Sequence, residues 1–301
     1  MGKHILITGG NGLIGKPLTQ LLLDKGYTVS HLSRTEANIP QVKTFLWDID
    51  QEEIDPNCIK GVDMIIHLAG AGIADSRWTD DRKQEILSSR TKSIELIYSL
   101  LKKHPHQVKK VISASATGYY CDRGDELLTE KSPPMVDFLG RCCVAWEKAV
   151  DKGEALDLKI LKFRTGVVLT DDGGALKQLA LPIKFGFGTV LDSGRQWVPW
   201  IHLQDAVDMY LYGVENELTG VYNMVAPNPV TNFKLTVATA TQLNRPLWLP
   251  KVPAFALKLV LGEMSAVVLY STKVSAEKIE KAGFRFKFPT IKEALRQIYA
   301  R

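Results

Sequence analysis

The chain has 301 residues, of which 45% are hydrophobic and 24% are charged, and this ordinary globular composition suits one large domain or two of medium size. A net charge of +5 with scattered basic residues, and no apolar run long enough to cross a bilayer, predict neither a nucleic-acid partner nor a membrane segment. The spacing of Cys58, Cys121, Cys142 and Cys143 suits neither a disulfide framework nor a zinc site, so we expect no metal and a reducing, cytoplasmic location.

The first element is a short apolar run at residues 4–8, which predicts a buried strand. It stops at Gly9, Gly12 and Gly15, spaced G-x-x-G-x-x-G, and an apolar helical pattern follows. Such a strand, turn and helix form a phosphate site, because the glycines admit a pyrophosphate to the backbone N–H groups and the helix N-terminus is partly positive. We therefore predict a dinucleotide site whose turn residues are Gly9, Asn11, Gly12, Leu13 and Ile14.

The second strand, residues 28–32, is followed by Ser33 and Arg34. An acidic residue at this place binds the ribose 2′-hydroxyl of NAD, whereas an arginine accommodates the 2′-phosphate of NADP. A hydroxyl and a guanidinium without a carboxylate favour NADP(H), although Arg34 would also suit a plain surface position. The third strand, residues 43–47, ends at Asp48, which is expected to bind the adenine amine, and residues 50–60 are predicted as loop or short helix.

The fourth strand, residues 64–68, ends in Ala69 and Gly70. Small residues there let a cofactor approach the backbone, but they would equally suit a tight turn without a ligand. His67 is a lone histidine in a buried strand, and we expect it to be structural. Helices over 78–101 and 138–152 alternate with strands over 111–117 and 160–166. This alternation predicts an α/β fold with a doubly wound parallel sheet and helices on both faces.

The alternation stops after residue 170. We predict a Rossmann-type domain over 1–170 and a smaller mixed lobe over 171–301, with a strand at 221–225 that can rejoin the main sheet. The other elements expected in the second half are helices over 176–185, 204–215, 231–243 and 253–262, an extended segment over 197–202, and a helix–turn–helix tail over 275–299.

Several segments resemble the extended short-chain dehydrogenase/reductase superfamily, which includes sugar-nucleotide epimerases and dehydratases. They are the glycine turn, His67-Leu68-Ala69-Gly70, Ser115-Ala116-Thr117, Arg164-Thr165-Gly166-Val167 and Trp200-Ile201-His202-Leu203-Gln204-Asp205. More narrowly, the chain looks like the atypical epimerase family called 39U, of which some members carry a cell-division-inhibitor-like label. The segments that carry this closer resemblance are Arg77-Trp78, Ser89-Arg90, Gly118-Tyr119-Tyr120, Trp146-Glu147 and Pro199-Trp200-Ile201-His202, and the tail from about residue 248 is similar to the family's short C-terminal domain.

The resemblance implies binding of NADP(H), and it implies that a homodimer can form. By the same resemblance, Asp48, Leu68, Ala69, Gly70, Glu85, Arg90 and Val168 line the cofactor site. The superfamily's chemistry uses a tyrosine and, four residues later, a lysine that lowers the tyrosine pKa. Here those two positions hold Leu139 and Cys143, and a shift by one residue gives Phe138 and Cys142, so the usual dyad is absent.

Other hydroxyl groups could take part in chemistry. Ser115 and Thr117 are candidates to hold a substrate carbonyl, and Tyr119 or Tyr120 could act as the acid, although these tyrosines could also only pack. A helical cysteine is more often a core residue than a nucleophile. We thus expect either an NADP(H)-dependent oxidoreductase or epimerase-like enzyme with Ser115, Thr117 and Tyr120 at its site, acting on an unidentified small molecule, or a non-catalytic NADPH-sensing regulator.

Overall fold

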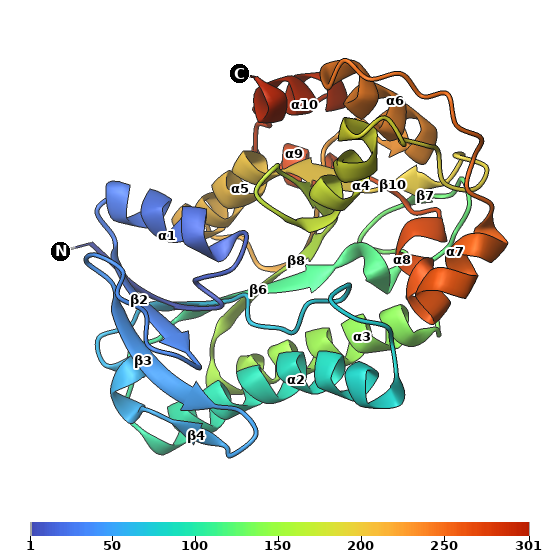
Figure 1. Cartoon of the computed structure of the whole chain (residues 1–301). Helices are drawn as coiled ribbons and strands as arrows, with labels where there is room; N and C mark the ends of the chain where they lie inside the picture. Colours follow the sequence, from blue (N-terminus) through green and yellow to red (C-terminus); the bar gives the residue numbers. More distant parts are fainter. Residues whose placement is uncertain (1, 301) are drawn as a thin grey trace.

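One eight-stranded sheet forms the centre of the protein, and the computed structural model describes residues 2–300 (Figure 1). The strand order is β12-β8-β6-β5-β1-β2-β3-β4, and only the β3–β4 pair at one edge is antiparallel. The predicted doubly wound parallel sheet is confirmed. The strands are β1 (His4–Thr8), β2 (Thr28–Ser33), β3 (Lys43–Asp48), β4 (Glu53–Ile54), β5 (Met64–His67), β6 (Lys110–Ala116), β8 (Lys159–Thr165) and β12 (Gly220–Met224).

Helices cover both faces of this sheet (Figure 1). Each turns an apolar stripe inward, such as Leu18 and Leu22 of α1 on one face and Ile94 and Ile97 of α2 on the other, all fully buried. Because both faces are covered, the inner strands are buried along most of their length. The helices are α1 (Gly15–Asp24) with α5 (Leu203–Glu215), and α2 (Asp80–Lys103) with α3 (Phe138–Asp151).

A smaller cluster of buried residues lies apart from the core of the main sheet and includes Leu176, Trp200, Leu235 and Leu295. Two short pairings frame it: β9 runs parallel to β11, and β10 runs antiparallel to β13. The remaining elements of this half of the chain are β9 (Val167–Leu169), α4 (Gly174–Lys184), β10 (Trp197–Val198), β11 (Trp200–His202), β13 (Val230–Thr231), α6 (Asn232–Gln242), α7 (Ala254–Leu261), α8 (Ala266–Leu269), α9 (Glu277–Lys281) and α10 (Ile291–Tyr299), of which α9 packs against the main core through Ile279.

The structure differs from the predicted elements in a few places. Residues 50–60 contain β4 as well as a short 3-10 turn, and a further two-residue strand, β14 (Lys273–Val274), pairs with β7 (Leu127–Leu128). The long helix begins at Asp80 because the Thr79 hydroxyl accepts the Arg82 N–H and caps it. β12 lies beyond residue 170 and pairs with β8, so the chain leaves the sheet and later returns to it. Among residues 2–300, no helix has the length and apolar character needed to cross a bilayer.

Candidate functional site

The candidate site lies where the strand order reverses. β1 is flanked by β2 on one side and by β5 on the other, and the connections after β1 and β5 leave in opposite directions. A crevice at the carboxyl ends of strands at such a switch point is the usual ligand site of doubly wound folds. The Thr8 hydroxyl oxygen accepts the backbone N–H groups of Leu68 and Ala69, both at 3.1 Å. This contact holds the ends of β1 and β5 together beneath the crevice.

The glycine turn after β1 has little room for side chains. Gly9 has a φ of +69°, and a Cβ there would lie 3.0 Å from the backbone of Leu68 and Ala69. A Cβ at Gly15 would lie 2.3 Å from the carbonyl oxygen of Gly9, so α1 sits directly on the turn. At Gly12 a Cβ would meet only that same oxygen, at 3.2 Å, and otherwise open space. Gly12 is therefore the glycine that a ligand could approach, at the N-terminus of a ten-residue helix.

The predicted adenosine-binding residues lie at the ends of β2 and β3. Arg34 is exposed and, within residues 2–300, forms neither an ion pair nor a hydrogen bond. The half-buried Ser33 accepts a hydrogen bond from the Thr35 N–H at 3.3 Å. One carboxylate oxygen of Asp48 accepts N–H groups of the turn that leads to β4, at 2.9 and 3.0 Å. Asp48 is thus committed in part to closing this turn.

Arg90 of α2 lies against the end of β5. Its side chain would be 3.2 Å from a Cβ at Gly70, and its guanidinium lies 5.1 Å from the centre of the Trp146 ring. Burial lowers the pKa of Arg90. Glu85, five residues earlier, is exposed, and its carboxylate pairs with Arg82 at 2.6 Å. Of the two α2 residues predicted to line the cofactor site, Arg90 lies against Gly70 in the loop after β5, whereas Glu85 pairs with Arg82.

The loop after β6 faces the two positions at which the resemblance puts the tyrosine and lysine. A Cβ at Gly118 would lie 3.5 Å from Leu139 Cβ and 3.7 Å from Cys143 Sγ. Both side chains are therefore next to the loop that carries the candidate hydroxyl groups. The four cysteines are buried free thiols, and burial raises the pKa of Cys143, which opposes thiolate formation.

The hydroxyl groups of Ser115 and Tyr120 are taken up by a buried polar network. Ser115 Oγ donates to Glu147 Oε1 at 2.7 Å, and Arg164 donates to both carboxylate oxygens of Glu147, at 2.8 and 2.9 Å. Tyr120 is fully buried; its hydroxyl donates to Asn223 and accepts from Arg164. Burial raises the pKa of Tyr120 to about 12. Tyr120 is therefore a core residue in this conformation and has no surface that a substrate could contact.

Of the remaining candidates, Thr117 is buried, whereas Tyr119 and Val168 are half-buried. Tyr119 is half-buried, and the Arg164 guanidinium lies 3.3 Å from the centre of its ring. The Thr117 hydroxyl donates a long bond to the Thr165 carbonyl, at 3.4 Å. Val168 of β9 is half-buried beside Ile201. The Glu147–Arg164 pair was not predicted from the sequence. Glu147 lies on a helix and Arg164 lies on a strand 17 residues later, and no sequence motif indicates that two such residues meet.

His67 occupies the structural place that was predicted for it. Its ring is fully buried between the hydroxyl groups of Ser93 and Ser113, at 2.8 and 3.2 Å. Burial lowers its pKa to about 3, so the ring is neutral at physiological pH. A second buried histidine, His31 of β2, was missed by the sequence analysis. The signal available was a histidine in the middle of a strand that the sequence places inside the sheet.

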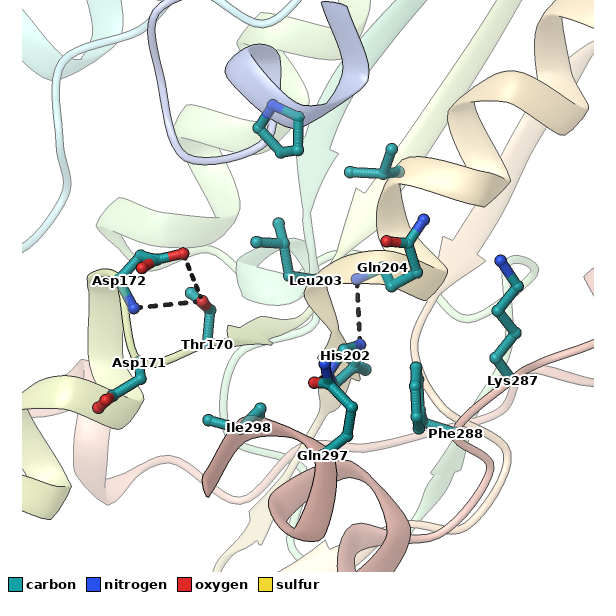
Figure 2. Close-up of a pocket in the computed structure, with 12 residues that line it drawn as sticks. Thr170, Asp171, Asp172, His202, Leu203, Gln204, Lys287, Phe288, Gln297 and Ile298 are labelled. Atoms are coloured by element: carbon teal, nitrogen blue, oxygen red, sulfur yellow. Dashed lines mark hydrogen bonds between the residues drawn. The ribbon is translucent and has the colours of Figure 1, made fainter. Parts of the chain in front are cut away.

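A cavity of about 440 Å³ lies outside the crevice, between α1, α5, α10 and the loop at residues 170–172 (Figure 2). His202 projects into it, accepts the Gln204 N–H and is hydrogen-bonded to Gln297 at 2.8 Å. Lys287 at its rim pairs with Asp208 at 2.7 Å. None of the predicted cofactor residues lines this cavity, and two of its charged residues, Asp171 and Lys287, are paired with Lys184 and Asp208.

Comparison with known proteins places this geometry in a family. Residues 5–137 match the NAD dependent epimerase/dehydratase family, and residues 252–298 match a domain of unknown function, DUF1731. The chain is 35% identical over 303 residues to an epimerase family protein, SSP1921, of Staphylococcus saprophyticus, covering 98% of this chain and 99% of that one. It is 36% identical over 300 residues to the epimerase family protein YfhF of Bacillus subtilis, covering 99% and 98%.

A plant and a human relative also match this chain over nearly its whole length. A chloroplastic homologue of SDR39U1 from Arabidopsis thaliana is 35% identical, with 98% of this chain and 86% of that protein covered. The human epimerase family protein SDR39U1, crystallised with NADPH, is 28% identical, with a TM-score of 0.86 and 99% of both chains covered. These full-length matches show that the chain belongs to the SDR39U1-like epimerase family, an atypical branch of the extended short-chain dehydrogenase/reductases.

Proposed function

We propose that the protein binds NADP(H) in the crevice at the carboxyl ends of β1 and β5. The observation that carries this proposal is the glycine turn, in which Gly9 and Gly15 are closed against the backbone while Gly12 opens to the N-terminus of α1. An exposed Arg34 without a carboxylate beside it suits the 2′-phosphate. The human relative crystallised with NADPH supports the same assignment.

Calorimetric titration with NADPH and NADH tests the proposal. NADPH should bind more tightly, and Arg34→Ala should weaken NADPH by about 1.5–3 kcal/mol, or roughly ten- to hundredfold in Kd, while NADH is unchanged. Gly12→Val should abolish binding of both, because its side chain would fill the approach to the turn. Equal affinities for the two cofactors, or normal binding by a folded Gly12→Val variant, would contradict the assignment.

For the reaction, we propose an oxidoreductase or epimerase-like activity without the tyrosine–lysine dyad. The bound cofactor supplies hydride chemistry, and the protein supplies orientation. Leu139 and Cys143 can neither donate a proton as a phenol does nor provide an ammonium group. Tyr119 is the remaining half-buried phenol beside Gly118, and Thr117 is the remaining hydroxyl on the loop. The substrate is a small polar molecule held between the two lobes.

This site should reduce a carbonyl better than it oxidises an alcohol. In the usual dyad the lysine ammonium stabilises the phenolate, and with Cys143 at that position a phenol at this site can donate a proton but is a poor base. Turnover should therefore be slow and mainly NADPH-consuming. Tyr119→Phe and wild type would be compared in both directions across a pH series. Fast alcohol oxidation near pH 7 that survives this substitution would refute the account.

One observation favours a second function, that of a non-catalytic NADPH-sensing regulator. Two of the three predicted catalytic hydroxyl groups, those of Ser115 and Tyr120, bond to Glu147 and Asn223 within the protein. An NADPH oxidation assay over a panel of carbonyl compounds and nucleotide sugars separates the two functions. A turnover that depends on Thr117 or Tyr119 supports the enzyme, whereas tight NADPH binding without turnover on any compound supports the regulator.

A further inference from the structure

His31 is a polar residue in a place where inner strands of parallel sheets hold apolar side chains. It lies on β2 and is 1% exposed. Its Nε2 lies 2.8 Å from the Thr19 hydroxyl of α1, and that hydroxyl donates to the Gly15 carbonyl, also at 2.8 Å. Because the hydroxyl proton is used there, the imidazole donates from Nε2. Among residues 2–300, the other ring nitrogen, Nδ1, has no hydrogen-bond partner. A buried polar atom left without a partner carries a cost that calls for an explanation.

The ring of His31 fills the space behind the glycine turn. A Cβ at Gly10 would lie 2.3 Å from Cε1, 2.4 Å from Nε2 and 2.5 Å from Nδ1 of the imidazole, so one face of the ring rests against the Cα of Gly10. Gly10 is the one residue of the turn's glycine cluster whose side-chain space is closed by a side chain rather than by backbone. The ring cannot swing away easily, because it is buried and held by Thr19.

We propose that His31 is a positioning residue of the dinucleotide site. Through one face it supports the turn at Gly10, and through Nε2 it holds α1 at Thr19, so a single side chain fixes the turn and the helix relative to each other. These two parts supply the backbone N–H groups that would face a pyrophosphate. The inference rests on the NADP(H) site proposed above, since a turn without a ligand would not need this alignment.

A size-exchange experiment tests the contact. Gly10→Ala should weaken NADPH binding strongly, because its new methyl group collides with the imidazole. His31→Ala should weaken it by about tenfold, because the turn and α1 lose their common support. In the double variant Gly10→Ala/His31→Ala the methyl group enters the space that the imidazole leaves. NADPH should therefore bind at least about fivefold more tightly than in Gly10→Ala alone, a coupling within the range of interaction energies between residues in contact. Circular dichroism and thermal unfolding would establish that each variant is folded.

Val29→Ala is the matched control. Val29 lies two residues earlier on β2, so it faces the same side of the sheet, and it is likewise 1% exposed. This substitution removes buried volume from the same strand without touching the turn, and it should lower stability while leaving the NADPH Kd unchanged. A folded His31→Ala variant with wild-type NADPH affinity, or a double variant that binds no better than Gly10→Ala, would overturn the positioning role. Wild-type protein that binds neither NADPH nor NADH would instead refute the proposed function.

Discussion

Breaking the buried pair of Glu147 and Arg164 should be among the most destabilising single substitutions in this protein. The two side chains are 9% and 4% exposed, and the carboxylate accepts three hydrogen bonds of 2.7–2.9 Å, two from Arg164 and one from Ser115. Glu147→Gln keeps the shape of the side chain, turns one accepting oxygen into an NH₂ donor, and leaves the guanidinium buried without a counter-charge. Breaking a buried pair in this way costs about 3–5 kcal/mol, which is a large part of a typical total of about 5–15 kcal/mol.

Urea denaturation followed by circular dichroism measures this loss as a lower midpoint at unchanged slope. The control is Glu95→Gln, which removes the exposed pair with Lys152, whose side chains are 40% and 63% exposed. That pair should contribute less than about 1 kcal/mol. A Glu147→Gln variant within about 1 kcal/mol of wild type, with the same slope, would refute the reasoning and indicate that water or another group satisfies Arg164.

Two further predictions concern buried side chains. Burial lowers the pKa of His31 to about 4 in the folded protein, whereas the pKa of an unfolded histidine is about 6.5. As the pH drops, the unfolded state therefore binds a proton before the folded state does. The free energy of unfolding should fall between about pH 6.5 and pH 4. Urea titrations at several pH values should show that the free energy of unfolding falls less with decreasing pH in His31→Ala than in wild type. The same pH dependence in both proteins would contradict the burial of a neutral ring. Tyr120→Phe leaves Asn223 and Arg164 each without one buried partner, so it should lower stability by about 1–3 kcal/mol while leaving NADPH affinity intact. A fall in NADPH affinity without a loss of stability would contradict this prediction and indicate that Tyr120 is part of the cofactor site.

The parts of the fold that could be predicted are those whose signals are local. The run at residues 4–8 and the spacing of Gly9, Gly12 and Gly15 fix a strand, a turn and a helix within a few residues of one another, and the structure has them there. Alternation of such units then implies a parallel sheet with covered faces.

What could not be predicted depends on partners far along the chain. Tyr120 was a catalytic candidate because of its neighbours in sequence, but its role depends on Asn223, which is 103 residues away. The strand at Lys273–Val274 exists only because Leu127–Leu128 pairs with it. Neither segment has a pattern of its own, since two residues are too few to show a period of two.

The return of β12 to the sheet has a consequence for how the chain folds during synthesis. β8 is completed about 55 residues before β12 begins, and at translation rates of roughly 5–20 residues per second this leaves an interval of about 3–11 seconds. During that time the backbone groups on one side of β8 have no strand to pair with, although most of its side chains belong to the core. An unpaired apolar edge of this kind is a template for association with other chains. A fragment that ends near residue 170 would keep that edge permanently, so it should aggregate unless a chaperone or an added β12 segment covers it.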